Sequence, residues 1–257
     1  MFELDLLVTG FPGMSTFHGG LGWSSVCLLQ DETHLVLLDT GGPGYVPLLR
    51  AGLEERGLRA DEVTDVLITH CHWDHVSNFT LFPNARIVVP RLEMEWASQQ
   101  LPGTWHLADL HIGRLLEMGA AVHLADDGEQ VLPGVSAIST PGHTPGHVAY
   151  RVRTAGGDAI FAGDAVKNRS ELVTGEVDLT LDAQASRRSV ERIRQMLLAD
   201  PKAVLIPGHD VRLSMVDGEV YPHGEWQAEI SALLGTDRYR TVTNLVGPTV
   251  TREASDG

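Results

Sequence analysis

The stretch that decides the fold is residues 69–75, which read Thr69-His70-Cys71-His72-Trp73-Asp74-His75. Three imidazoles and one carboxylate lie within its last six residues. In an extended segment, two His side chains at positions i and i+2 point to the same side, and the adjacent Asp and His can reach a second position nearby. Imidazole and carboxylate together suit zinc, and also iron or manganese. The stretch therefore predicts a site for two neighbouring divalent metal ions.

The surroundings of this cluster indicate an α/β sheet. A short apolar run that ends at Ile68 is typical of a buried strand. The cluster then lies after the carboxyl end of a strand, where functional loops of α/β sheets usually lie. The same arrangement recurs three times, because strand-like runs at 135–140, 159–162 and 203–206 each lead into a glycine and a single candidate ligand. These ligands are His143, Asp164 and His209.

This set of residues resembles the pattern of the metallo-β-lactamase-fold hydrolases, which is His-x-His-x-Asp-His followed by a distant His, Asp and His. All seven positions are filled here, by His70, His72, Asp74, His75, His143, Asp164 and His209. Residues 38–42, Leu-Asp-Thr-Gly-Gly, also resemble a strand-end motif of the family. The resemblance covers nearly the whole chain, and it implies an α/β fold, the four-layer αββα sandwich of two sheets flanked by helices.

The resemblance also implies how the ligands divide between two metals. The first metal is expected to bind His70, His72 and His143. The second is expected to bind Asp74, His75 and His209. Asp164 would bridge them, and a hydroxide shared by both metals would attack the carbonyl of a small lactone, ester or related compound. Metal binding can lower the pKa of water from about 15.7 to about 7. Asp74 is the catalytic candidate that would receive or relay a proton, and zinc is expected in preference to iron or manganese.

Within the family, the chain resembles the N-acyl homoserine lactonase-like branch at residues 81–85 and 91–96. One position departs from that branch. Characterised lactonases of one type carry a tyrosine three residues after the bridging Asp, where this chain has Lys167. A lysine there can bind a carbonyl oxygen or a carboxylate, which favours an anionic substrate, so Lys167 is the candidate substrate residue. Asp39 and Thr69 are candidates for orienting the ligand imidazoles.

Three alternatives stay open on the same set of residues. A phosphodiesterase or nuclease is disfavoured by the net charge of −15 and by the short interval between Asp164 and His209, which leaves no room for the inserted domain of the family's nucleases. A thioesterase of the glyoxalase II type lacks a convincing equivalent of that enzyme's basic C-terminal helical segment. A sensor or binding module without hydrolytic activity is disfavoured because the ligand set is complete.

The chain as a whole is predicted to be one hydrolase domain, residues 1–235, followed by a C-terminal extension, residues 236–257. This extension is either flexible or a dimer arm. Strands are also expected at 4–8, 23–30, 35–38 and 86–89, and helices at 45–56, 91–99, 107–118 and 185–198.

Composition bounds the location and the partners. There is no apolar run of about 18 residues, no basic segment at the start and no disulfide framework in two cysteines. We therefore expect a cytoplasmic protein that acts on a small molecule, with no membrane or nucleic-acid partner and a homodimer left open.

Overall fold

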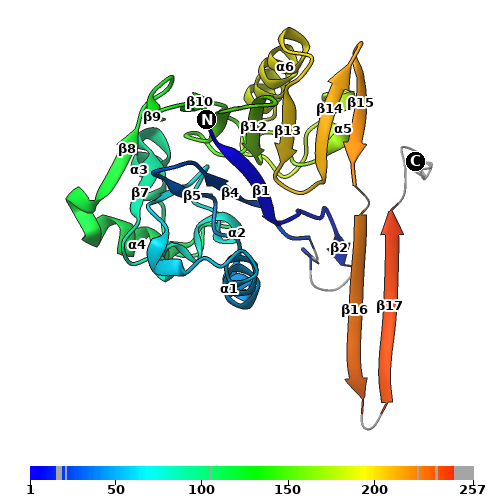
Figure 1. The fold of residues 1–257 in the computed structure, drawn as a ribbon, viewed down its shortest axis with the longest axis horizontal. Coiled ribbons are helices and arrows are strands. Elements are labelled where there is room, and N and C mark those ends of the chain that lie inside the picture. Colours follow the sequence, from blue (N-terminus) through cyan, green and yellow to red (C-terminus); the bar gives the residue numbers. More distant parts are fainter. Residues whose placement is uncertain (16–18, 21, 105, 225, 235–236, 246–257) are drawn as a thin grey trace.

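The computed structural model describes residues 1–15, 19–20, 22–104, 106–224, 226–234 and 237–245. Two mixed sheets lie face to face (Figure 1). The first has six strands, in the order β1 (Glu3–Val8), β4 (Val26–Gln30), β5 (Leu35–Leu38), β6 (Asp65–Leu67), β7 (Arg86–Pro90) and β8 (Val122–Ala125). The second has seven strands, in the order β15 (Glu219–His223), β14 (Arg212–Val216), β13 (Val204–Pro207), β12 (Gly157–Gly163), β11 (Val148–Thr154), β10 (Val135–Ser139) and β9 (Gln130–Leu132).

Helices cover the outer face of each sheet, which completes the four-layer αββα sandwich expected from the sequence. The first sheet is covered by α1 (Val46–Glu54), α3 (Arg91–Ala97) and α4 (Asp109–Met118), and the second by α5 (Arg169–Thr174) and α6 (Ala183–Ala199). The short elements are η1 (Pro43–Tyr45), η2 (Ala60–Glu62), α2 (Trp73–Val76), η3 (Phe79–Leu81), η4 (Gly119–Ala121) and the pair β2 (Met14–Ser15) and β3 (Gly19–Gly20).

The central strands are apolar on both faces because each sheet has buried side chains on both sides. In β4, Leu28 packs among the helices outside the first sheet, whereas the next residue, Leu29, packs between the two sheets. Successive strand residues point to opposite faces, so a strand between two cores has a continuous apolar run rather than an alternating one. Burial of one such Leu contributes about 1.5–3 kcal/mol.

Parallel pairing places the functional loops at one edge. Strands β5, β6 and β7 run parallel to one another, and β12 runs parallel to β13. The carboxyl ends of these strands therefore open toward the same end of the molecule. Between the sheets, the Tyr150 hydroxyl donates a hydrogen bond of 2.9 Å to the carbonyl of Ile68, directly before the ligand cluster. This contact ties the second sheet to the loop that carries the cluster.

The predicted elements are present, with differences at their ends. The strand expected from Trp23 begins at Val26 because Ser24 and Ser25 turn their hydroxyls to other loops: Ser24 donates to the carbonyl of Asp74, and Ser25 donates to the carbonyl of Pro207 at 2.7 Å. These contacts fasten the start of β4 to two ligand-bearing loops.

The chain ends in a hairpin of β16 (Trp226–Leu234) and β17 (Asp237–Leu245), which Figure 1 shows running away from the two sheets. The hairpin spans the predicted boundary between residues 235 and 236, and residues 246–257 of the predicted extension lie outside the described residues. The division into a domain and an extension stays a prediction. In the part of the chain that is described, the helices are all too short or too polar to cross a membrane.

Candidate metal centre

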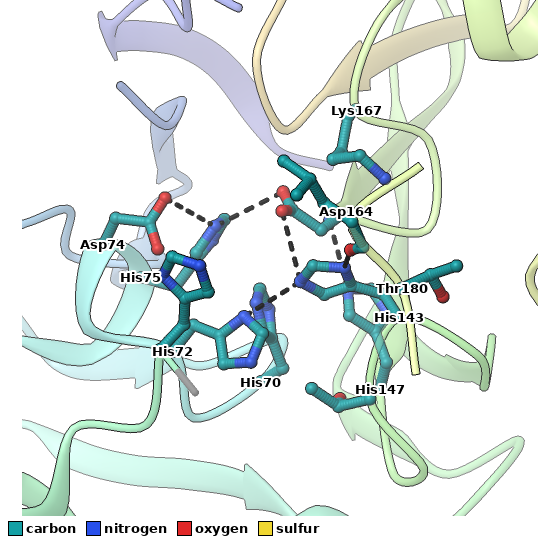
Figure 2. Close-up of polar contacts among 12 residues, drawn as sticks. His70, His72, Asp74, His75, His143, His147, Asp164, Lys167 and Thr180 are labelled. Atoms are coloured by element: carbon teal, nitrogen blue, oxygen red, sulfur yellow. Dashed lines mark hydrogen bonds and ion pairs between the residues drawn. The ribbon is translucent and has the colours of Figure 1, made fainter. Parts of the chain in front are cut away.

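The cluster at residues 70–75 is shaped by a change from extended to helical backbone. After β6 the chain bends at Thr69, and His72 is in the extended conformation directly before the first turn of α2. His70 and His72 therefore project to one side, while the side chain of Cys71 between them is buried in the helix-side core. The turn of α2 then brings Asp74 and His75 toward the same space, as Figure 2 shows.

The seven predicted ligands lie together at the shared edge of the two sheets. Their nitrogen and oxygen atoms form three overlapping groups within 4.8 Å: His70, His72 and His143; Asp74, His75 and His209; and His70, His75 and Asp164. The first two groups correspond to the two ligand sets expected from the family pattern. Metal ligation by these residues stays a prediction, but the structure brings all of them to one place.

Asp164 stands between the two groups. Its Oδ2 lies 3.3 Å from Nε2 of His143, and its Oδ1 lies 3.3 Å from Nε2 of His75 and 3.3 Å from Nε2 of His209. Each oxygen of the carboxylate thus faces a different set of imidazoles. This is the arrangement that a carboxylate bridging two cations requires.

The donor atoms fit divalent metals. Nε2 of His70, Nε2 of His75 and Oδ1 of Asp164 are buried and make no hydrogen bond within the described residues. A buried polar atom without a hydrogen bond costs about 1–3 kcal/mol, so these atoms indicate a ligand between them. Nitrogen and carboxylate donors at this density suit zinc, iron or manganese.

The protonation states of the imidazoles also favour the binding of divalent metals. Burial, reinforced by four nearby histidines, holds the pKa of His70 well below its ordinary value, and burial lowers the pKa of His72 to about 4. Both are therefore neutral, which is the form that binds metals. Burial would also lower the pKa of His75, but the carboxylates around it outweigh burial and raise its pKa well above the ordinary value. The carboxylates thus favour a positive charge in this space, which a metal can supply.

Asp39 and Thr69 orient two of the imidazoles, and these hydrogen bonds confirm the contacts predicted for them. Nδ1 of His75 donates to Oδ2 of Asp39 at 2.7 Å. Thr69 donates its hydroxyl to the same oxygen at 2.8 Å and accepts from Nδ1 of His70 at 2.9 Å. With both Nδ1 atoms engaged as donors, the Nε2 lone pairs of His70 and His75 face the centre.

Backbone carbonyls orient two further imidazoles, those of His143 and His209. Nδ1 of His143 lies 2.9 Å from the carbonyl oxygen of Leu179, and Nδ1 of His209 lies 3.0 Å from that of Trp23. No sequence pattern points to these two carbonyls, because any residue type can supply them. They are functional contacts that sequence reasoning missed.

His147 supports Asp164 from behind. Its Nε2 accepts a hydrogen bond of 3.1 Å from the backbone N–H of Asp164, so the proton is on Nδ1 and is donated to Thr140 Oγ1 at 2.9 Å. Burial lowers the pKa of His147 to about 3, which keeps the ring neutral. The ring therefore places the backbone of Asp164 and is absent from the groups of candidate ligands.

Glu93 is a second residue that the sequence did not reveal. This carboxylate in α3 is completely buried and accepts hydrogen bonds from the backbone N–H of Cys71 at 3.0 Å, from the hydroxyl of Thr144 at 2.7 Å and from the backbone N–H of Gly146 at 3.2 Å. It thereby joins the loop of His70 and His72 to the loop of His143. The available signal was its place on the buried face of α3, four residues before Ala97.

A cavity of about 150 Å³ opens above the centre, and both Lys167 and Asp164 line it. Figure 2 shows Lys167 on the Asp164 side of the cluster. Its Nζ lies 2.7 Å from Oε1 of Glu171 and donates a hydrogen bond of 2.9 Å to the carbonyl of Asp178. The candidate substrate residue therefore reaches the cavity with its charge already paired.

The chain is similar to known proteins in both sequence and structure. Residues 19–209 match the family model described as the metallo-beta-lactamase superfamily. The chain is 31% identical over 194 residues to human metallo-beta-lactamase domain-containing protein 1, a match that covers 74% of this chain and 63% of that protein. It is 23% identical over 160 residues to an N-acyl homoserine lactonase of a Bacillus species, covering 62% of this chain and 60% of that enzyme. The chain thus spans under two thirds of the length of both relatives.

Solved structures show the same fold. An N-acyl homoserine lactone hydrolase with the product N-hexanoyl-L-homoserine bound at its catalytic metal centre has a TM-score of 0.64 and 21% identity, covering 82% of this chain and 93% of that one. A dizinc quorum-quenching lactonase in complex with a product has a TM-score of 0.64 and 19% identity, covering 78% of this chain and 79% of that one. At these identities the likeness establishes the arrangement of the sheets and helices.

Proposed function

We propose that this chain, which belongs to the metallo-beta-lactamase superfamily, is a hydrolase that uses two divalent metals to hydrolyse a small lactone, ester or related carbonyl compound. The observation that carries the proposal is the position of Asp164. Its two carboxylate oxygens face His143 on one side and His75 with His209 on the other. A carboxylate placed in this way can hold two cations at once, as a dinuclear centre needs.

Two bound divalent metals would lower the pKa of a water molecule to about 7 and would polarise the carbonyl of the substrate. The predicted ligands His70, His72 and His143 would hold one of them, and Asp74, His75 and His209 the other. The chain itself supplies the fixed geometry. The hydrogen bonds of Asp39, Thr69 and the two backbone carbonyls hold four of the five imidazoles in one orientation, those of His70, His75, His143 and His209, so little rearrangement of these rings is needed when a substrate binds.

Asp74 is proposed as the group that accepts a proton. It lines the cavity, and its Oδ2 lies 3.5 Å from Nε2 of His75 and 3.5 Å from Nε2 of His209. Burial would raise the pKa of this carboxyl, but the two imidazoles outweigh burial and hold the pKa below its ordinary value. The carboxylate is therefore ionised at neutral pH and can take up a proton at an oxygen that faces the cavity.

Lys167 is proposed to contact the substrate. An ammonium group has three N–H bonds. Glu171 and the Asp178 carbonyl engage two of them, and the Asp178 carboxylate lies 3.7 Å from the same nitrogen, so the third N–H can turn between that exposed carboxylate and the cavity that Lys167 lines. Because Glu171 balances its charge, the donor suits a carbonyl oxygen better than a carboxylate. Together with the names of the lactonase relatives, this favours an uncharged carbonyl compound.

The test combines metal analysis with a substrate panel. The purified protein is expected to contain close to two divalent metal ions per chain. Its rates should be measured with a lactone, an uncharged ester, a thioester, a β-lactam and a phosphodiester. We expect hydrolysis of the lactone or the ester, and loss of that activity after treatment with a chelator. Exclusive activity on the thioester or the phosphodiester would replace this proposal with one of the two enzymatic alternatives.

Zinc as the metal, a homodimer and a cytoplasmic location are proposals that follow from the sequence alone. The domain boundary at residue 235 is a proposal of the same kind. Metal analysis tests the first of these, and the molecular mass in solution tests the second.

A further inference from the structure

Residues 178–182, here called the strap, connect α5 to α6 and lie directly against the centre. The carbonyl oxygen of Leu179 is 2.9 Å from Nδ1 of His143. Two positions further on, the backbone N–H of Leu181 donates to the carbonyl of Gly142 at 3.1 Å. The strap therefore orients a predicted metal ligand through backbone atoms alone.

The strap is strained where it meets this ligand. Leu179 has a φ of 41°, in the left-handed region that bulky side chains rarely adopt. Its side chain is 49% exposed, so packing gives little compensation. Backbone strain of this kind costs about 1–3 kcal/mol and persists only where surrounding contacts enforce it.

Lys167 supplies a contact that enforces the conformation. Its Nζ donates to the carbonyl of Asp178 at 2.9 Å, one residue before Leu179. Glu171 holds both the ammonium group and the backbone of Lys167. Its Oε1 lies 2.7 Å from Nζ, and its Oε2 accepts a hydrogen bond of 2.7 Å from the backbone N–H of Lys167. Lys167 is 7% exposed and Glu171 is 4% exposed. Both side chains are thus held in place beneath the strap.

We propose that Lys167 is a positioning residue of the metal centre. Held by Glu171, it fixes the Asp178 carbonyl, and the next peptide then presents the Leu179 carbonyl to Nδ1 of His143. This role is separate from contact with the substrate. It rests on the proposed function only in that His143 binds a metal, and it does not depend on which compound is hydrolysed.

The first test measures zinc affinity in competition with a chelator for the wild type, Lys167→Met and the control Lys202→Met. Lys202 is the only other lysine of the chain and is exposed. Loss of a residue that orients a metal ligand typically lowers metal affinity about 10–100-fold. We expect that loss for one zinc ion in Lys167→Met and wild-type affinity in Lys202→Met. Wild-type zinc affinity in Lys167→Met would overturn the proposal, even if hydrolysis were impaired, because only substrate contact would then be lost.

A double variant separates the lost contact from the carboxylate that Lys167→Met leaves without its partner. In Lys167→Met/Glu171→Gln that carboxylate is replaced by an amide. We expect the weakened zinc affinity to persist, whereas recovery to the wild-type value would show that the unpaired buried charge of Glu171 caused the loss and that the proposal is wrong.

Hydrogen exchange gives a readout that needs no metal. The amide of Leu181 should exchange at least 10-fold faster in both lysine-167 variants than in the wild type, because the strap opens more often. Unchanged exchange in these variants would contradict the proposed role. If the wild-type protein binds no zinc, the proposed function fails, while this exchange experiment still reports whether Lys167 fixes the strap.

Discussion

Glu93 Oε2 accepts a hydrogen bond from the hydroxyl of Thr144 at 2.7 Å, inside a completely buried site. Thr144 follows the predicted ligand His143, and the other oxygen of Glu93 accepts from the backbone N–H of Cys71, between His70 and His72. A single helical side chain thus fixes the spacing of two ligand loops that are more than 70 positions apart in the sequence.

The first prediction concerns removal of this carboxylate. Glu93→Ala leaves the N–H groups of Cys71 and Gly146 and the Thr144 hydroxyl without an acceptor, and each such group costs about 1–3 kcal/mol. We expect the free energy of unfolding to fall by at least about 2 kcal/mol and zinc affinity to fall with it. Denaturant titration measures the first. Glu95→Ala, an exposed position on the same helix, is the control, and equal stability of the two variants would refute the role of Glu93.

The second prediction concerns pH. Burial raises the pKa of Glu93 to about 7, whereas an unfolded glutamate has a pKa of about 4.3. The folded protein therefore binds the extra proton, and the stabilisation is fully present below about pH 4.3 and is lost as the pH rises through 7. In the metal-free protein the wild type should lose up to about 3 kcal/mol relative to Glu93→Gln over this range. A constant difference between the two proteins from pH 5 to pH 8 would contradict the shift.

The third prediction concerns the proposed bridge. Asp164→Ala is expected to abolish hydrolysis and to lower the metal content, because both groups of imidazoles lose their shared carboxylate. Metal analysis and initial rates provide the measurement. Asp61→Ala is the control, since the Asp61 side chain is 51% exposed, pairs with Arg59 and is not part of the cavity lining. Full activity with unchanged metal stoichiometry in Asp164→Ala would rule out the bridge.

The fourth prediction concerns His147. His147→Ala removes the acceptor for the Asp164 backbone N–H, and supporting residues of this kind typically contribute about 10–100-fold to metal affinity or activity. We expect a loss in that range, with partial recovery in His147→Gln, whose side-chain oxygen can accept the same hydrogen bond. His123→Ala serves as the control because His123 is a partly exposed residue paired with Glu129. An equal effect of both alanine variants would count against a specific role for His147.

The fifth prediction concerns metal removal. A metal at 100 times its dissociation constant stabilises the folded state by about 2.7 kcal/mol. In a domain of this size, 1 kcal/mol corresponds to about 2–4 °C, so a chelator should lower the Tm by about 5–10 °C. Added zinc should restore it. A Tm that the chelator leaves unchanged in the wild type would show that no metal is bound to the folded state.

The sequence predicted the fold because its strongest patterns are local. Apolar runs followed by candidate ligands located four strands, three of them with a glycine directly before the ligand, and placed their loops at one edge. The family resemblance supplied the sandwich. Strands β8, β9, β11, β14 and β15 were not predicted. For β14 and β15 a signal was present, because Asp217-Gly218 between them is a typical two-residue hairpin turn with both residues at positive φ. No candidate ligand follows any of these five strands, so the pattern that located the others did not reach them.

The residues of the candidate site also fall into two groups, those that the sequence predicted and those that only the fold reveals. Residues such as His143 are recognisable by their chemistry, so the sequence identified them. Glu93 and Glu171 resemble ordinary helical glutamates until the fold buries them beside backbone donors. The Leu179 carbonyl has no side-chain signature at all. Contacts of these kinds depend on tertiary structure, and they are the ones that position the predicted ligands.

The seven predicted ligands come from both halves of the sandwich. The loop after β6 in the first sheet carries four of them, and the loops after β10, β12 and β13 in the second sheet carry His143, Asp164 and His209. A metal pair held by this set would link the loops of the two sheets to each other. Neither sheet alone contains a complete centre, so the site exists only when the two halves are closed against each other, and catalytic competence reports directly on the assembly of the whole fold.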